Sequence, residues 1–153
     1  MSYQHILLVT DLLSDADIVA QRAKRILAGS PEAKLSVLHI VEDDMVRFGY
    51  ELVPASSLSG DVDGKHWQEA RAKLAQFLAR NNLRAVNSEV TAAISNDEGI
   101  VNYCRKKDVD LLIIGRHERH GIAAWLIGAT ADNILPNAPC DSLVVKLDQP
   151  VPQ

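Results

Sequence analysis

The chain has 153 residues, of which 47% are hydrophobic and 24% charged, a balance typical of one soluble globular domain rather than a disordered or fibrous chain. Its formal net charge of -4 offers no basic surface to a phosphate backbone or an anionic membrane, so we expect neither nucleic acid nor membrane as a partner. The two cysteines, Cys104 and Cys140, have no CxxC spacing, and the first residues show neither a cleavable leader nor a spanning stretch, so we expect a reduced, cytoplasmic protein.

The first part of the chain alternates between strand and helix patterns. The stretch "HILLVTD" (5–11) has consecutive apolar residues, which predict a strand buried on both faces. The stretch "DADIVAQRAKRILAG" (15–29) has apolar residues at helical spacing, acids at its start and a glycine at its end, so it predicts a helix. The stretch "AKLSVLHIVEDD" (33–44) then predicts a second buried strand followed by three acids.

The middle of the chain begins with an irregular stretch. Residues 45–64 show no clean period and contain a proline, glycines and serines, so they predict a long connection without regular structure. The following segment, 61–83, carries an apolar stripe at helical spacing and predicts a second helix that ends at two asparagines. The stripe consists of Trp67, Ala70, Leu74, Phe77 and Leu78.

The alternation continues to the end of the chain. Residues 88–94 predict a third strand, and 95–110 predict a helix with acids in its first turn and cations in its last. Residues 109–115 predict a fourth buried strand, 130–138 a short helix stopped before Pro136, and 141–147 a fifth strand. Such alternation favours a parallel sheet with helices on both faces, built as a single domain over 1–148 with a frayed tail at 149–153.

The expected ligand position follows from this architecture. In open parallel sheets, ligands bind beyond the carboxyl ends of the strands, at the point where the strand order reverses. We expect that point between the first and fourth strands, which places Asp11 and Gly115 beside each other.

Four stretches, in this order and spacing, resemble the universal stress protein family over nearly the whole chain: "ILLVTD", "LSVLHIVED", "VDLLIIG" and "LIGATADNIL...APCDSLVVKL". The resemblance implies an open five-stranded parallel sheet in the order 3-2-1-4-5, of the Rossmann-like, adenine nucleotide alpha hydrolase-like class, and a role in stress response. It also implies a homodimer formed through the last strand, Asp141 to Leu147, and related stress proteins as further partners. The apolar character of that strand supports this, because it would otherwise leave an exposed sheet edge.

Part of this family binds ATP through the loop after the fourth strand. That loop reads Gly, two residues, Gly, nine residues, Gly, then Ser or Thr. In this chain Gly115 and Gly128 match, whereas Glu118 replaces the second glycine and Ala129 the hydroxyl residue. By the same resemblance, Asp11 matches the acid that contacts ribose, and the backbone of Val41 falls where adenine binds. The predicted cofactor-binding positions are Thr10, Asp11, Val41, Gly115, Arg116, Gly128, Ala129 and Thr130.

The two departures weaken the predicted nucleotide site. A carboxylate about 4 Å from a phosphate oxygen, at an effective dielectric constant of about 20, costs roughly 4 kcal/mol, which is close to a thousandfold in affinity. The loss of the hydroxyl at Ala129 removes a charge-assisted hydrogen bond worth about 1.5–3 kcal/mol, which Thr130 would replace in part. Arg116 and Arg119 in the same loop would offset part of this loss. The sequence therefore predicts weak or absent ATP binding, with an ATP- and Mg²⁺-dependent switch of slow hydrolytic activity as the alternative.

Other chemistries find little support in the sequence. The "HERH" stretch at 117–120 lacks the HExxH spacing of a helical zinc site, and the acids at 42–44 are typical of a solvated turn, so we expect no metal site. No nucleophile elbow, P-loop or dinucleotide fingerprint is present, so we assign no catalytic residue. A phosphorelay receiver domain would need an aspartate directly after the third strand, and "VTAAIS" supplies none. His5 and His39 are expected to pack or hydrogen-bond, and Cys104 to lie in the core.

Overall fold

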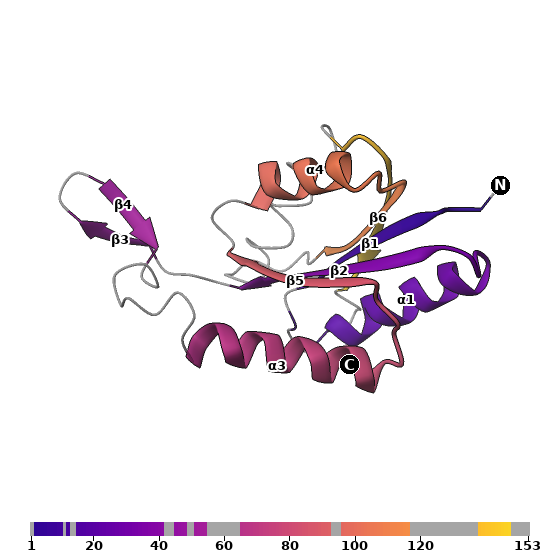
Figure 1. Ribbon diagram of the computed structural model, residues 1–153, viewed down its shortest axis with the longest axis horizontal. Helices are drawn as coiled ribbons and strands as arrows, with labels where there is room; N and C mark the ends of the chain where they lie inside the picture. Colours follow the sequence, from indigo (N-terminus) through magenta and orange to yellow (C-terminus); the bar gives the residue numbers. More distant parts are fainter. Residues whose placement is uncertain are drawn as a thin grey trace, which may run out of the picture.

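Five parallel strands form one sheet in the computed structural model, which describes residues 2–10, 12, 15–41, 45–48, 51–54, 65–92, 96–116 and 138–147 (Figure 1). The strands lie in the order β5-β2-β1-β6-β7, which confirms the predicted order 3-2-1-4-5. Every neighbouring pair in this sheet is parallel. Their bounds are β1 His5–Thr10, β2 Lys34–Val41, β5 Asn87–Ala92, β6 Leu111–Arg116 and β7 Asp141–Lys146.

Helices cover both faces of this sheet, as the continuous apolar strands predict. Helices α1 (Ala16–Ala28) and α3 (Lys65–Arg80) lie on one face, and α4 (Asn96–Lys106) lies on the other (Figure 1). The side chains of β1 alternate between the two layers: Ile6 and Leu8 pack with α1 and α3, whereas Leu7 and Val9 pack with α4. Because neither face meets water, no position of this strand can be polar without a buried partner.

The helix boundaries follow local sequence signals. Helix α1 begins after Asp15 and ends before Gly29, whose backbone N–H bonds the carbonyl of Ile26 at 3.1 Å. Helix α3 buries Ala70, Leu74 and Phe77 against the sheet, which confirms the predicted stripe. Its end is marked by Asn82, which adopts a left-handed φ of 52° that asparagine tolerates well.

The predicted irregular connection over 45–64 is wrong for its first half. Strands β3 (Met45–Phe48) and β4 (Glu51–Pro54) pair as an antiparallel hairpin, which lies apart from the five-stranded sheet (Figure 1). Two residues, Gly49 and Tyr50, separate them in the sequence, the commonest length for a hairpin connection. Strands of four residues are too short to show a period, so only this spacing could have indicated the hairpin.

Two further predicted segments lie outside the described residues: nearly all of the short helix at 130–138, and the tail at 149–153. None of the helices in the described part of the chain has the length and the apolar run that crossing a bilayer requires.

Candidate functional site

The strand order reverses at β1, where the sequence places the ligand. Strands β2 and β5 lie on one side of β1, and β6 and β7 lie on the other. Leu8 pairs with Ile113, so two residues further along both strands Thr10 lies level with Gly115. Thr10 is also paired with His39 of β2. The expected neighbourhood of the first and fourth strands is therefore present, at the edge of the sheet where parallel α/β proteins bind ligands.

Buried hydrogen bonds fix the chain where it leaves β1. The hydroxyl of Thr10, only 3% exposed, accepts the backbone N–H of Leu12 at 3.0 Å. Leu12 adopts a left-handed φ of 58°, an uncommon conformation for a leucine, and such strain is often held at functional sites. The Thr10 hydroxyl thus holds the backbone of Leu12, two residues beyond the end of β1.

His39 completes this arrangement from the neighbouring strand. Its Nδ1 lies 3.1 Å from the carbonyl oxygen of Thr10, and because a carbonyl only accepts, that nitrogen carries the proton. The ring is buried, with 5% of its surface exposed. The sequence predicts a hydrogen-bonding residue at this position, and that is confirmed, but sequence reasoning did not count it among the site residues. The sequence feature that could have marked His39 as a site residue is its polar side chain in the last third of an otherwise apolar, buried strand.

Gly115 has a packing role that the sequence did not reveal. A Cβ at this position would lie 2.7 Å from Cδ1 of Leu147 and 3.0 Å from Cγ2 of Val19. The first distance is shorter than real contacts of a Cβ atom and the second is tighter than an ordinary contact, so the missing side chain at residue 115 lets helix α1 and the residue after β7 pack this closely over β6. The resemblance assigned Gly115 to a phosphate loop, and the packing gives an independent reason for the same residue.

The remaining predicted site residues divide into two groups. Val41 and Arg116 are the last residues of β2 and β6, so the backbone at both positions lies at the same carboxyl edge as Thr10 and Gly115. The other predicted residues lie outside the described ones: Asp11, Glu118, Gly128, Ala129 and Thr130.

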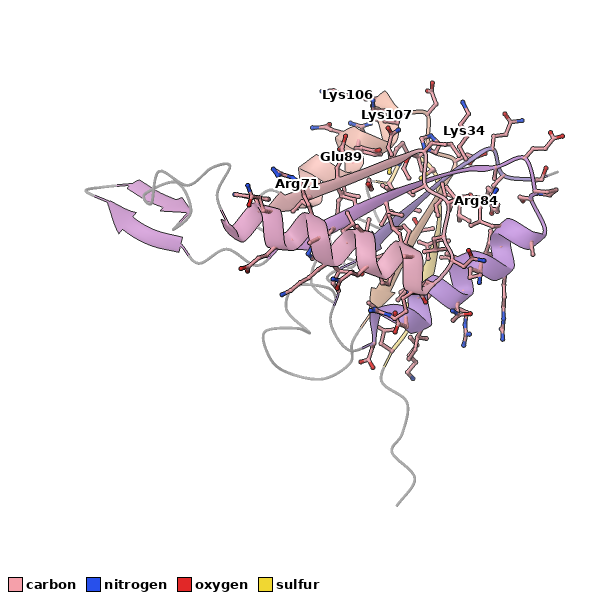
Figure 2. The ribbon with its side chains drawn as sticks, turned by 60° about the horizontal axis from the view of Figure 1, so that its bottom comes forward. Lys34, Arg71, Arg84, Glu89, Lys106 and Lys107 are labelled. Atoms are coloured by element: carbon pink, nitrogen blue, oxygen red, sulfur yellow. The ribbon has the colours of Figure 1, made fainter. Side chains whose placement is uncertain are left out.

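The opposite end of the sheet carries a different set of groups. His5 at the start of β1 bonds the carbonyl of Lys107 through Nδ1 and the hydroxyl of Ser36 through Nε2, both at 2.7 Å, which confirms it as a hydrogen-bonding residue. Cations gather at this end, where strands begin and helices finish (Figure 2). They are Lys34, Arg84, Lys106 and Lys107. They lie at the far end of the strands from the crevice and do not contribute to it.

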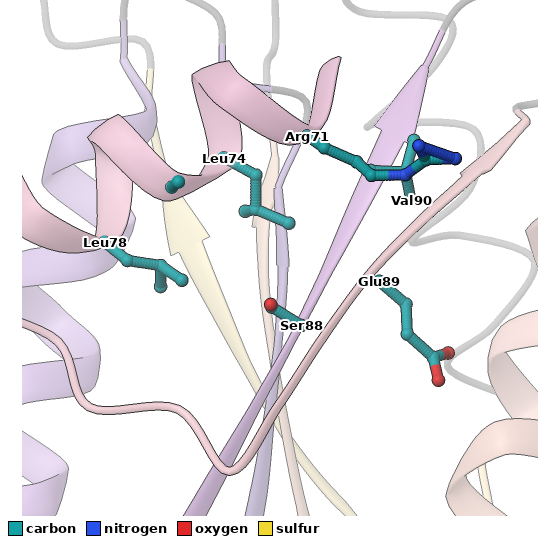
Figure 3. A pocket seen from close by; sticks show the side chains of 7 residues that line it. Arg71, Leu74, Leu78, Ser88, Glu89 and Val90 are labelled. Atoms are coloured by element: carbon teal, nitrogen blue, oxygen red, sulfur yellow. The ribbon is translucent and has the colours of Figure 1, made fainter. Parts of the chain in front are cut away.

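A hollow of about 430 Å³ lies between α3 and the edge strand β5 (Figure 3). Leu74 and Leu78 project from the helix toward the strand, and Arg71 and Val90 also line the hollow (Figure 3). This hollow is two strands away from β1, so it is separate from the crevice at the strand reversal.

Metal ligands do not gather in the described part of the chain. No group of three or more His, Cys, Asp or Glu side chains among those residues is placed to hold an ion. The two stretches weighed for a metal, 42–44 and 117–120, lie outside it.

The sheet order and the reversal at β1 define an α/β protein of the nucleotide-binding type. The universal stress protein family matches residues 2–146. The chain therefore belongs to the universal stress protein family, as the sequence resemblance predicts.

Individual relatives agree with this assignment. "Universal stress protein A homolog 2" of Coxiella burnetii is 30% identical over 148 residues, which cover 95% of this chain and 97% of the relative. Universal stress protein UspA from Lactobacillus plantarum has a similar fold, with a TM-score of 0.67 at 23% identity, covering 95% of this chain and 99% of that one. A universal stress protein solved in complex with cAMP has a TM-score of 0.60 at 20% identity, covering 97% of this chain and all of that one.

Proposed function

We propose that this chain is a stress-response protein that works as a homodimer and whose crevice at the carboxyl ends of β1 and β6 accepts triphosphates poorly or not at all. Family membership supports the general role, and the level placement of Thr10 and Gly115 supports the position of the crevice. We infer a cytoplasmic location, because the spacing of the two cysteines in the sequence is not that of a disulfide framework.

The observation that carries this proposal is the acid at residue 118. Strand β6 ends at Arg116, at the end of the sheet where phosphates bind in such folds, and Glu118 comes two residues later in the sequence. A triphosphate carries several negative charges, and each phosphate oxygen near the carboxylate adds to the repulsion. Ala129 further lacks the hydroxyl that the ATP-binding branch supplies.

A second candidate function is a nucleotide-dependent switch. A solved universal stress protein with a similar fold is described in complex with cAMP, which carries a single negative charge. A single phosphodiester meets far less repulsion from one carboxylate than a triphosphate does. In this alternative, Asp11, the backbone of Val41, Gly115 and Gly128 hold the nucleotide, and Arg116 or Arg119 neutralises the phosphate. If ATP were the ligand, Mg²⁺ would accompany it and hydrolysis would be slow.

Calorimetric titration with Mg-ATP and with cAMP tests the proposal. We expect Mg-ATP to bind the unmodified protein weakly or undetectably, and Glu118→Gly combined with Ala129→Ser to tighten binding by at least about tenfold, because one like charge is removed and one donor restored. Glu32→Gln, which removes an exposed acid from the turn between α1 and β2, is the matched control and should change nothing. Tight Mg-ATP binding by the unmodified protein, or no gain in the double variant, would contradict this account. Binding of cAMP alone would favour the second candidate.

A further inference from the structure

The two cysteines of the chain, which are far apart in the sequence, meet at the start of β6. The carbonyl of Cys104, near the end of α4, accepts the backbone N–H of Val109 at 2.9 Å, two residues before β6 begins. The first residue of β6, Leu111, is paired with Asp141, which directly follows Cys140. The backbone thus brings both cysteines to the same end of the same strand.

Strand alternation also puts the two side chains on the same face. Ser142 and Val144 of β7 pair with Leu112 and Ile114, both of which pack in the layer beneath α4. Because side chains alternate along a strand, Cys140 shares the face of Ser142 and Val144. It packs against the cluster that contains Cys104, and the two thiols hydrogen-bond each other.

We propose that Cys104 and Cys140 form an intramolecular disulfide bond when the protein is exposed to a hydroperoxide. Cys140 is half-buried and Cys104 is 1% exposed, so the peroxide meets Cys140 first. Cys140 packs against the cluster that contains Cys104, and the contact between the two thiols brings the second sulfur within reach of the first.

The chemistry has two balanced steps. The Cys140 thiolate attacks one oxygen of hydrogen peroxide, which breaks the O–O bond, forms a sulfenic acid and releases hydroxide, which takes up the thiol proton as water. The Cys104 sulfur then attacks the sulfenic sulfur, the S–S bond forms, and the departing hydroxyl leaves with the Cys104 proton as a second water. Two thiols lose two electrons and one peroxide gains them.

The surroundings of the pair set a slow rate for this reaction. Burial raises the pKa of the Cys104 thiol to about 12. Burial also raises the pKa of the Cys140 thiol, the contact with Cys104 offsets part of that rise, and the charges of Asp141 and Asp110 add smaller increases. The reactive thiolate is therefore a small fraction at neutral pH, and the pair responds to sustained exposure rather than to a brief pulse.

Peptide mapping of the intact, reduced protein after hydrogen peroxide treatment tests this proposal. We expect the whole chain to lose two hydrogens and to yield one linked peptide that contains Cys104 and Cys140. Cys104→Ala and Cys140→Ser should each abolish the linked peptide. The matched control combines Cys140→Ser with Ser142→Cys, which keeps two thiols but moves one of them by two residues, roughly 6.6 Å along the strand direction and away from the start of β6, where Cys104 lies.

Three outcomes would overturn the proposal. The first is that both thiols remain titratable after unfolding of the peroxide-treated protein. The second is a disulfide between two chains, visible on a non-reducing gel, in place of the bond within one chain. The third is an equal yield of bonded product from the variant with the displaced cysteine, which would show that the native contact between the thiols does not direct the reaction. A variant that fails to fold is recognised by its circular dichroism spectrum, and the mapping of the unmodified chain then decides alone.

Discussion

At the scale of single residues, Gly115 shows how one position satisfies two demands. It stands at the carboxyl end of β6, level with Thr10, where a ligand would approach the backbone. It also leaves room for Val19 of α1 and for Leu147, which occupy the volume that a Cβ would need. The packing of the core therefore favours a residue without a side chain at this position even without any ligand.

Gly115→Ala should destabilise the ligand-free protein by about 1–3 kcal/mol, because a methyl group would have to displace Val19 or Leu147. Gly29→Ala is the matched control: its φ of -83° suits alanine, and its Cβ would meet only the carbonyl of Ile26, at 3.6 Å. That change should be neutral or stabilise by up to about 1 kcal/mol. Urea unfolding of both variants measures the difference, and equal effects would show that the space around Gly115 is not restrictive.

At the scale of elements, a polar junction joins α1 to the end of α3. The Asp17 carboxylate accepts Nδ2 of Asn81 at 2.8 Å and the guanidinium of Arg80 at 2.9 Å. Asn81 is buried and also receives Nε2 of Gln21 at 3.2 Å. The hydrogen bond from Asn81, followed by those from Arg80, holds the pKa of the Asp17 carboxyl below its ordinary value of 3.8. The two helices on one face of the sheet are thereby linked outside their apolar contacts.

This junction should make stability depend on pH in a defined window. A carboxyl whose pKa is lowered by folding stabilises the protein above the ordinary value of 3.8 and loses that contribution as the pH falls through the lower folded pKa. Because the Asp17 side chain is 48% exposed and that of Arg80 59% exposed, we expect Asp17→Asn to cost only about 0.5–1 kcal/mol at neutral pH. Denaturant unfolding at several pH values checks this, and the cost should disappear in acid.

Salt separates the two contributions at this junction. The hydrogen bond from the neutral Asn81 is insensitive to ionic strength, whereas the exposed ion pair with Arg80 is screened. High salt should therefore remove only part of the cost of Asp17→Asn. A complete loss of the effect in salt would show that Arg80, rather than Asn81, dominates.

At the scale of the whole molecule, the two edges of the sheet differ. Among the described strands, β5 and β7 each have a sheet neighbour on one side only. Strand β5 is polar along its exposed part, with Asn87, Ser88 and Glu89 facing solvent. Strand β7 instead has only half-buried residues at 142–144, including two apolar ones. An apolar, half-buried edge is the one that gains from pairing with a second copy.

The proposed homodimer through β7 can be tested by placing the same charge on each edge. Ser142→Lys on β7 should convert a species near twice 16.8 kDa into one near 16.8 kDa, because lysine at an edge opposes strand pairing. Ser88→Lys on β5 carries the same change on the opposite edge and should leave the mass unaltered. Light scattering over a concentration series measures both. A protein that is monomeric at every concentration, or a dimer disrupted only by the β5 variant, would contradict the proposed interface.

Local sequence patterns predicted most of the fold. The consecutive apolar residues at 6–9 and 111–114 indicate strands whose two faces are both buried. Because segments with helical apolar spacing alternate with such strands along the chain, the sequence predicts a parallel sheet between two layers of helices. The apolar stripe of α3 and the glycine that ends α1 could be predicted as well, because each is a local signal that depends on residues within one or two helical turns. The hairpin of β3 and β4 was missed because four-residue strands give too few positions for a period.

What the sequence determined by itself is the succession of strands and helices and the family to which the chain belongs. The tertiary structure alone decided which residues meet: His39 with the carbonyl of Thr10, Gly115 with Val19, and Cys104 with Cys140. The physical reason is that a local pattern shows which face of an element is buried, whereas a contact depends on register and packing between elements distant in the chain. Those relations exist only once the sheet has formed.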